Sequence, residues 1–100
     1  MIYYTQLIFI KPGKEQIFHA FEDKVLPLIT DHDGELIYRI RPAKESFIAN
    51  AQELPYEVHL VSFNSKAGFE SFAKDPRRLA CLDEKNASVE RIVLIEGVQL

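Results

Sequence analysis

Four stretches of this chain have the density or alternation of apolar residues that is typical of β-strands. They are residues 2–11, 35–41, 56–64 and 88–97. In the first and third, both alternating sets of positions are apolar, which predicts strands that are covered on both faces and lie centrally in a sheet. In the second, Ile37, Arg39 and Arg41 share one set of positions, and Leu36, Tyr38 and Ile40 belong to the other. That alternation predicts an edge strand or a strand with one face in solvent.

Between the first two strands the apolar spacing changes to three and four residues, which predicts a helix over residues 13–31. The apolar stripe of this helix comprises Ile17, Phe21, Val25 and Leu28. Pro27 is expected to tighten the last turn. Asp33-Gly34 is expected to end the helix in a left-handed turn, because glycine adopts that conformation without a steric cost.

Two shorter helices are predicted over residues 65–74 and 76–83, with Asp75 capping the second. The resulting order is strand, helix, strand, strand, helix, strand, which is the ferredoxin-like arrangement. Right-handed crossovers place the helices on one face of a four-stranded antiparallel sheet. A length of 100 residues corresponds to one domain. The predicted fold class is therefore α+β, with a single domain over residues 1–100.

The connection over residues 42–55 is the longest irregular stretch, and it carries the apolar residues Phe47 and Ile48. Two interpretations are open. Loops of this length often serve a binding site or a partner, in which case Phe47 closes a pocket or packs on a second subunit. Alternatively, the connection is a hairpin loop that covers Phe47 with its own residues.

The second face of the predicted sheet has apolar residues and no helix to cover it. An exposed apolar sheet face is rare on a monomer and marks an interface. We therefore predict a homodimer that packs sheet against sheet, with Leu7 and Phe9 at the seam if the set of positions that they share faces the partner.

The composition of the chain limits the partners, the cellular location and the disulfides that we expect. The formal net charge of −3 and the absence of a large basic patch argue against nucleic acid as a partner. No signal peptide opens the chain and no apolar run is long enough to span a membrane, so we predict a cytoplasmic protein without a membrane partner. The single cysteine, Cys81, excludes an internal disulfide.

The turns and caps resemble those of the dimeric α+β barrel superfamily. The shared features are Lys11-Pro12-Gly13-Lys14, Val25-Leu26-Pro27-Leu28, Gly34-Glu35-Leu36, Arg39, Phe63-Asn64-Ser65, Asp75-Pro76 and Ile95-Glu96-Gly97. The outline is similar to that of small uncharacterised single-domain members and of antibiotic-biosynthesis-monooxygenase-like and EthD-like proteins. The resemblance implies a dimeric barrel with a pocket between sheet and helices, and as one alternative a cofactor-free monooxygenase or isomerase. Haem-degrading relatives use a tryptophan, which this chain lacks.

The second hairpin carries the main candidate chemistry. Suppose that the numbers of any two residues that lie opposite each other in this hairpin sum to about 98. Arg39 then lies opposite His59, and Arg41 lies opposite Glu57, all on one face of the sheet. One interpretation makes His59 an acid–base group and Arg39 the holder of an anionic or enolate oxygen. The other makes these residues a cross-strand charge ladder on an exposed or interfacial face.

A candidate ligand site comprises Tyr4 and Gln6 of the first strand, together with His59 and Tyr38. A few polar groups among aliphatic residues are typical of a site for a small apolar or aromatic molecule. The alternative places Tyr4 and Gln6 in hydrogen bonds at the dimer seam.

Other chemistry has little support in the sequence. His19, His32 and His59 lie on three different elements without ligand spacing, so no metal site is predicted. His19 falls off the apolar stripe and is expected to face solvent. There is no serine elbow, activated cysteine or glycine-rich phosphate loop, and we predict no cofactor.

Overall fold

The computed structural model describes residues 1–49 and 53–100. Its strands are β1 (Ile2–Ile10), β2 (Gly34–Ile40), β3 (Glu57–Phe63) and β4 (Val89–Val98). Its helices are α1 (Glu15–Val25), α2 (Lys66–Ala73), α3 (Pro76–Leu79) and α4 (Leu82–Ser88), with 3₁₀ segments η1 (Leu26–His32) and η2 (Lys44–Ser46). The predicted order of elements is confirmed. The helix predicted over residues 76–83 is instead two short helices, and the second continues to the start of β4.

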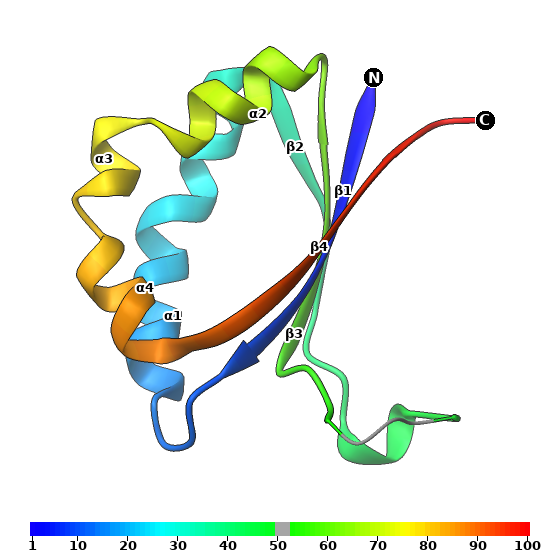
Figure 1. Cartoon of the computed structure of the whole chain (residues 1–100), viewed down its shortest axis with the longest axis vertical. Coiled ribbons are helices and arrows are strands. Elements are labelled where there is room, and N and C mark those ends of the chain that lie inside the picture. Colours follow the sequence, from blue (N-terminus) through cyan, green and yellow to red (C-terminus); the bar gives the residue numbers. More distant parts are fainter. Residues whose placement is uncertain (50–52) are drawn as a thin grey trace.

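The four strands form one antiparallel sheet in the order β2-β3-β1-β4. The central position of the first and third strands and the edge position of the second are therefore confirmed. Among the described residues, helices α1 to α4 and the segment η1 lie on one side of the sheet, and only the short turn η2 lies on the other side, beyond the end of the sheet (Figure 1). The chain thus has two layers, and one face of the sheet is open.

The helical layer begins with α1, whose buried residues include Phe18, Phe21 and Val25. Pro27 follows in the 3₁₀ segment η1, so the predicted tightening of the last turn is confirmed. The left-handed residue is Asp33, with φ 58°, and not Gly34. Gly34 is required for a different reason, because a Cβ atom there would lie 2.6 Å from the Phe63 ring and 2.7 Å from the Ile29 side chain.

A register shift between Leu36 and Tyr38 interrupts β2. From Tyr38 onward the predicted register holds, and Arg39 lies opposite His59. Before the shift, Leu36 lies opposite Val61 and packs against the core. The prediction that Leu36 shares a face with Tyr38 and Ile40 is therefore wrong, because an extra residue in one strand reverses the alternation beyond it.

The hydrophobic core lies between the sheet and the helical layer. Tyr4, Ile29, Val61 and Phe63 are each at most 2% exposed and form its centre. The Tyr4 ring stacks on Phe69 of α2 with the ring centroids 4.0 Å apart. These contacts hold α2 against the end of the sheet where β1 begins and β3 ends (Figure 1).

The open face of the sheet is largely apolar. Across the strands, Leu7 lies between Val58 and Val93, and Thr5 lies between Leu60 and Ile95. Ile40, Tyr38 and Ile95 are 48%, 59% and 53% exposed. Phe9 is covered by the Arg91 guanidinium, 3.8 Å from the ring centroid. We call this surface the open face.

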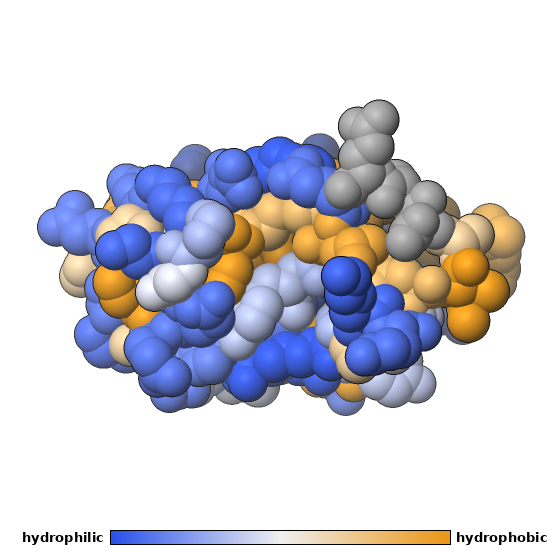
Figure 2. Space-filling view, turned by 90° about the horizontal axis from the view of Figure 1, so that it is seen from below, coloured by the Kyte–Doolittle hydropathy of each residue, from blue (hydrophilic) through white to orange (hydrophobic). Residues whose placement is uncertain are grey.

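The connection between β2 and β3 contains the 3₁₀ turn η2, and residues 50–52 lie outside the described part. Phe47, Leu54 and Tyr56 line a groove of about 400 Å³ beside it. Figure 2 views the molecule from this end and shows hydrophobic surface in the middle, bordered by hydrophilic surface. Phe47 thus faces a groove, while Ile48 is 97% exposed. None of the described helices is long and apolar enough to cross a membrane.

Candidate functional site

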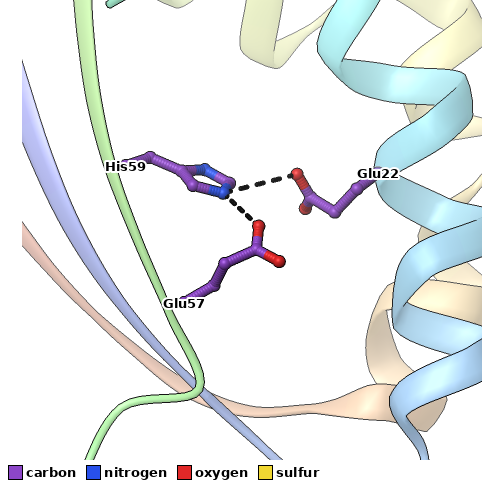
Figure 3. A group of neighbouring side chains, drawn as sticks. All are labelled: Glu22, Glu57 and His59. Carbon is purple, nitrogen blue, oxygen red and sulfur yellow. Dashed lines mark hydrogen bonds and ion pairs between the residues drawn. The ribbon is translucent and has the colours of Figure 1, made fainter. Parts of the chain in front are cut away.

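Three ionisable side chains meet between the sheet and α1. The alternation of β3 points both Glu57 and His59 towards the helices, and Glu22 of α1 points back at them (Figure 3). Their exposed fractions are 0%, 2% and 5%. Buried ionisable groups of this kind require partners, since an isolated charge in an apolar interior is costly.

Glu57 has a full set of partners. The His59 ring nitrogen Nε2 lies 2.6 Å from Glu57 Oε1. Arg39 Nε donates to the same oxygen at 2.7 Å, and Arg41 Nε donates to Oε2 at 2.7 Å. An ionised carboxylate only accepts hydrogen bonds, so Nε2 of His59 carries the proton in this pair. The other ring nitrogen, Nδ1, is then the basic atom of the neutral imidazole.

Glu22 has no such set. Its Oε2 is the one buried side-chain oxygen or nitrogen of the described residues that lacks a hydrogen-bond partner. Nε2 of His59 lies 4.0 Å from this oxygen, which is too far for a hydrogen bond. Nε2 already donates to Glu57, so Glu22 is left without a donor.

The pKa values of the two carboxyl groups consequently shift in opposite directions. Burial raises the pKa of Glu22 to about 7. The negative charge of Glu57 adds to this rise, whereas His59 and Arg39 oppose it. Burial alone would raise the pKa of Glu57 as well. Hydrogen bonds from His59, Arg39 and Arg41 outweigh burial there and lower that pKa to about 2. Near neutral pH Glu57 is ionised, whereas Glu22 is able to take up or release a proton.

A cavity of about 60 Å³ adjoins this cluster, several times the roughly 10–15 Å³ that one water molecule requires. Glu22 and His59 form part of its polar lining, and Gln6 lies beside them on the adjacent strand. The apolar lining includes Phe21, Val25, Val61, Phe63, Phe69 and Phe72. The lining combines an apolar wall with a few convergent polar groups, which is the composition of a small-molecule site, in a volume well below the roughly 300–1,000 Å³ of sites for drug-sized ligands.

The structure brings three of the four predicted ligand residues together. Tyr4, Gln6 and His59 all line the cavity. The hydroxyl of Tyr4 donates to Glu96 Oε1 at 3.0 Å, and burial together with that bond raises its pKa to about 12. Tyr4 therefore offers its ring, and not an ionisable hydroxyl. Tyr38 does not line the cavity and lies on the open face.

Arg39, the second predicted catalytic residue, is bound to Glu57 and is absent from the cavity lining. Its contact is with the group that holds His59, which makes it a positioning residue in this geometry. The four residues Arg39, Arg41, Glu57 and His59 do form a cross-strand ladder, but it lies on the face of the sheet that the helices cover and not on an exposed or interfacial face. Of the four, only His59 lines the cavity. The catalytic and ligand-binding roles of these residues stay predictions.

Glu22 was missed by the sequence analysis, although a signal for it exists. It lies four residues after Phe18 and three before Val25, on the buried stripe of α1. A charged residue at such a position is buried by the helix period itself. His19 was also misjudged, since its Nε2 lies 2.6 Å from the Tyr56 hydroxyl and its ring stacks on Tyr56.

Comparisons with known proteins agree with this architecture. A protein of unknown function from Rhodopseudomonas palustris superposes with a TM-score of 0.81 at 18% identity, over 99% of this chain and 82% of that one. A protein from Mesorhizobium loti, described as a dabb family protein with a ferredoxin-like fold, gives 0.72 at 19%, over 99% and 96%. A protein from Bacteroides fragilis, described as dimeric, of unknown function and ferredoxin-like, gives 0.69 at 12%, over 96% and 93%.

The chain has the ferredoxin-like fold. No protein-family model matches the sequence, and no curated protein matches it. At these identities the likeness concerns the fold alone, so function has to be argued from the side chains of this ferredoxin-like domain.

Glu22, Glu57 and His59 each offer one ligand atom, and these atoms lie within 4.8 Å of one another. One histidine with two carboxylates is a donor set that binds divalent metals. The charges around it oppose a cation, because Arg39 and Arg41 already occupy Glu57 and two more cationic side chains line the cavity. The prediction of no metal site stays a prediction.

A second polar cluster lies outside the cavity. His32 Nδ1 is 2.8 Å from the Ser71 hydroxyl, and His32 Nε2 is 2.8 Å from Asp75 Oδ2. Asp75 also accepts from the backbone N–H of Arg77, so its predicted capping role is confirmed. None of these side chains lines the cavity. The cluster ties η1 to α2 and to the start of α3.

The raised pKa of Glu22 predicts a stability that falls as pH rises. Below about 4.5, its ordinary value, Glu22 carries a proton in both the folded and the unfolded chain. Between about 4.5 and about 7 only the folded chain keeps that proton, so rising pH favours unfolding. Above about 7 the loss levels off, at up to about 3 kcal/mol. Glu22→Gln should lack this decline.

Urea unfolding at about pH 5 and about pH 8 measures the effect, with the exposed Glu90→Gln as the matched control. The stability of Glu22→Gln relative to the unsubstituted protein should rise by about 1–3 kcal/mol between the two conditions. Glu90→Gln should follow the unsubstituted protein. If the free energy of unfolding depended equally on pH in all three proteins, Glu22 would not be the group with the raised pKa.

Proposed function

We propose that this chain binds a small, largely apolar molecule between its sheet and its helices and moves a proton on that molecule through Glu22. The observation that carries the proposal is a buried, unpartnered carboxylate oxygen at an apolar cavity. An unsatisfied buried polar atom costs stability, and such costs are found where a group has a task. A carboxyl group with a pKa near 7 suits general acid–base chemistry at neutral pH.

The proton transfer follows from the pair of carboxylates. Ionised Glu22 takes a proton from an activated C–H bond, and the electron pair of that bond stays on the substrate as an enolate or carbanion. Glu57 remains ionised throughout, held by Arg39 and Arg41, and keeps His59 in one orientation. Protonated Glu22 then returns the proton, either to the same carbon or to another. This division between a fixed and a titrating carboxylate is a recurring arrangement of acid–base sites.

Two reaction classes begin with this step. Return of the proton to a different carbon is an isomerisation. Reaction of the carbanion with molecular oxygen is the cofactor-free monooxygenation that the family resemblance implies. Glu22 and His59 serve the first step of both, and no cofactor is required for that step.

We also propose that residues 1–100 form one domain of a homodimeric barrel, assembled through the open face. Support comes from the exposed apolar residues of that face and from the description of the Bacteroides fragilis protein as dimeric. A second sheet packed against the open face would remove these residues from water. The cytoplasmic location and the absence of nucleic-acid and membrane partners stay predictions.

The proton transfer is tested with 5-nitrobenzisoxazole, a neutral aromatic probe. A base removes its ring C–H proton, the N–O bond breaks, and the coloured cyanonitrophenolate forms. The protein should accelerate this reaction with a rate that rises through about pH 7, as Glu22 ionises. Glu22→Gln should lower the rate at least about 100-fold, the usual contribution of a general base.

Glu90→Gln supplies the matched control, because it removes an exposed carboxylate and should leave the rate unchanged. His59→Gln should lower the rate less than Glu22→Gln does. A folded Glu22→Gln protein with the unsubstituted rate would overturn the proposal.

The homodimer is tested by sedimentation of Leu7→Glu, which places a charge in the middle of the open face. The substitution should weaken association at least about 100-fold, because a buried unpaired charge costs several kcal/mol. Leu79→Glu is the control, since Leu79 is 46% exposed on α3 in the helical layer. An unsubstituted protein that sediments as a monomer at micromolar concentration would exclude the barrel.

A further inference from the structure

Two cationic side chains of the helical layer line the same cavity as Glu22 and His59. They are Arg78 of α3 and Lys85 of α4. Both are partly buried, and both lie within reach of the charge of Glu22. The proton-transfer mechanism proposed above gives neither of them a role.

Neither cation has an ion-pair partner within residues 1–49 and 53–100. Arg78 donates to the backbone oxygen of Ala73 at 3.1 Å and lies over the Phe72 ring. In the same described residues, the Lys85 side chain donates no hydrogen bond. Some more exposed cations are paired, for example Lys24 with Glu84 and Lys66 with Glu96, and others, such as Lys14 and Lys74, have no ion pair among the described residues. Arg78 and Lys85 differ from these exposed unpaired cations in being partly buried beside the cavity, where an unpaired charge is more costly.

The buried carboxylates Glu22 and Glu57 do not neutralise the positive charges of Arg78 and Lys85. Glu57 is already bound by Arg39 and Arg41. Glu22 is the remaining carboxylate, and its pKa of about 7 means that it carries only part of a charge near neutral pH. Burial lowers the pKa of both Arg78 and Lys85, and the nearby charge of Arg78 lowers that of Lys85 further. With Glu22 ionised, one positive charge is left over at the cavity, so a singly charged anion would neutralise it.

We propose that the molecule bound in this cavity is a small carboxylic acid, whose carboxylate is held by Arg78 and Lys85 while its apolar part lies against the phenylalanines. The inference rests on the proposed function and adds the charge of the ligand. A carboxylate fits two separate donors better than a phosphate ester would, because it brings one negative charge into a small cavity that also holds Glu22. The helical layer then supplies the anion site, and the sheet supplies His59 beside the apolar part.

Benzoate, benzamide and benzamidine test this proposal, because they share one shape and carry a negative, zero and positive charge. Binding to the unsubstituted protein is measured by calorimetry at neutral pH and low salt. Benzoate should bind at least about tenfold more tightly than benzamide, the value of one charge-assisted contact, and benzamidine most weakly. Lys85→Gln should remove the preference for benzoate and leave benzamide unchanged.

Lys66→Gln is the matched control, because Lys66 is 62% exposed and does not line the cavity. Lys85→Arg keeps the charge and should keep the preference for benzoate. Benzamide binding as tightly as benzoate would overturn the anion site and leave the apolar pocket of the proposed function standing. If none of the three probes binds, both the anion site and the proposed pocket are excluded.

Discussion

Two carboxylates lie beside one histidine in the interior, and the sheet supplies strong donors for only one of them. Arg39, Arg41 and His59 all donate to Glu57. Once they are used, Oε2 of Glu22 has no hydrogen-bond donor among the described residues, and burial raises the pKa of Glu22 towards neutrality. The same interior therefore holds a fixed anion and a titrating acid a few ångströms apart. The proposed chemistry depends on this unequal distribution of partners.

The two-layer fold makes that distribution possible. In β3, alternation sends Glu57 and His59 towards the helices and Val58 and Leu60 to the open face. In β2, the register shift after Leu36 keeps that leucine on the core while Arg39 and Arg41 still reach Glu57. One face of the sheet thus serves the cavity and the other is left for assembly. The two tasks share strands but no side chains, so each can be altered alone.

Much of the framework could be predicted from the sequence because it depends on local periodicity. The alternation of apolar residues showed which strands lie at the centre of the sheet and that the second strand lies at an edge. The pairing of Arg39 with His59 followed from the lengths of the two strands. Glu22 was missed because the buried stripe of the helix was traced from apolar residues alone, although the spacing of Glu22 from Phe18 and Val25 places it on that stripe. Leu36 was misplaced because a bulge leaves no sign in the alternation of the sequence. Tyr38 was grouped with Tyr4 by residue type, whereas the register separates them onto opposite faces. Arg78 and Lys85 enter the cavity through tertiary packing that no local pattern records.

The central claim concerns one ionisation, and it can be observed directly. Carbon-13 NMR of the glutamate side-chain carboxyls, with Glu22 assigned from its missing signal in Glu22→Gln, follows the titration of this group in the folded protein. The account predicts a midpoint near pH 7 for Glu22 and one near pH 2 for Glu57. A midpoint for Glu22 near 4.5, its ordinary value, would mean that this carboxylate is solvated or paired, and the acid–base proposal would be lost.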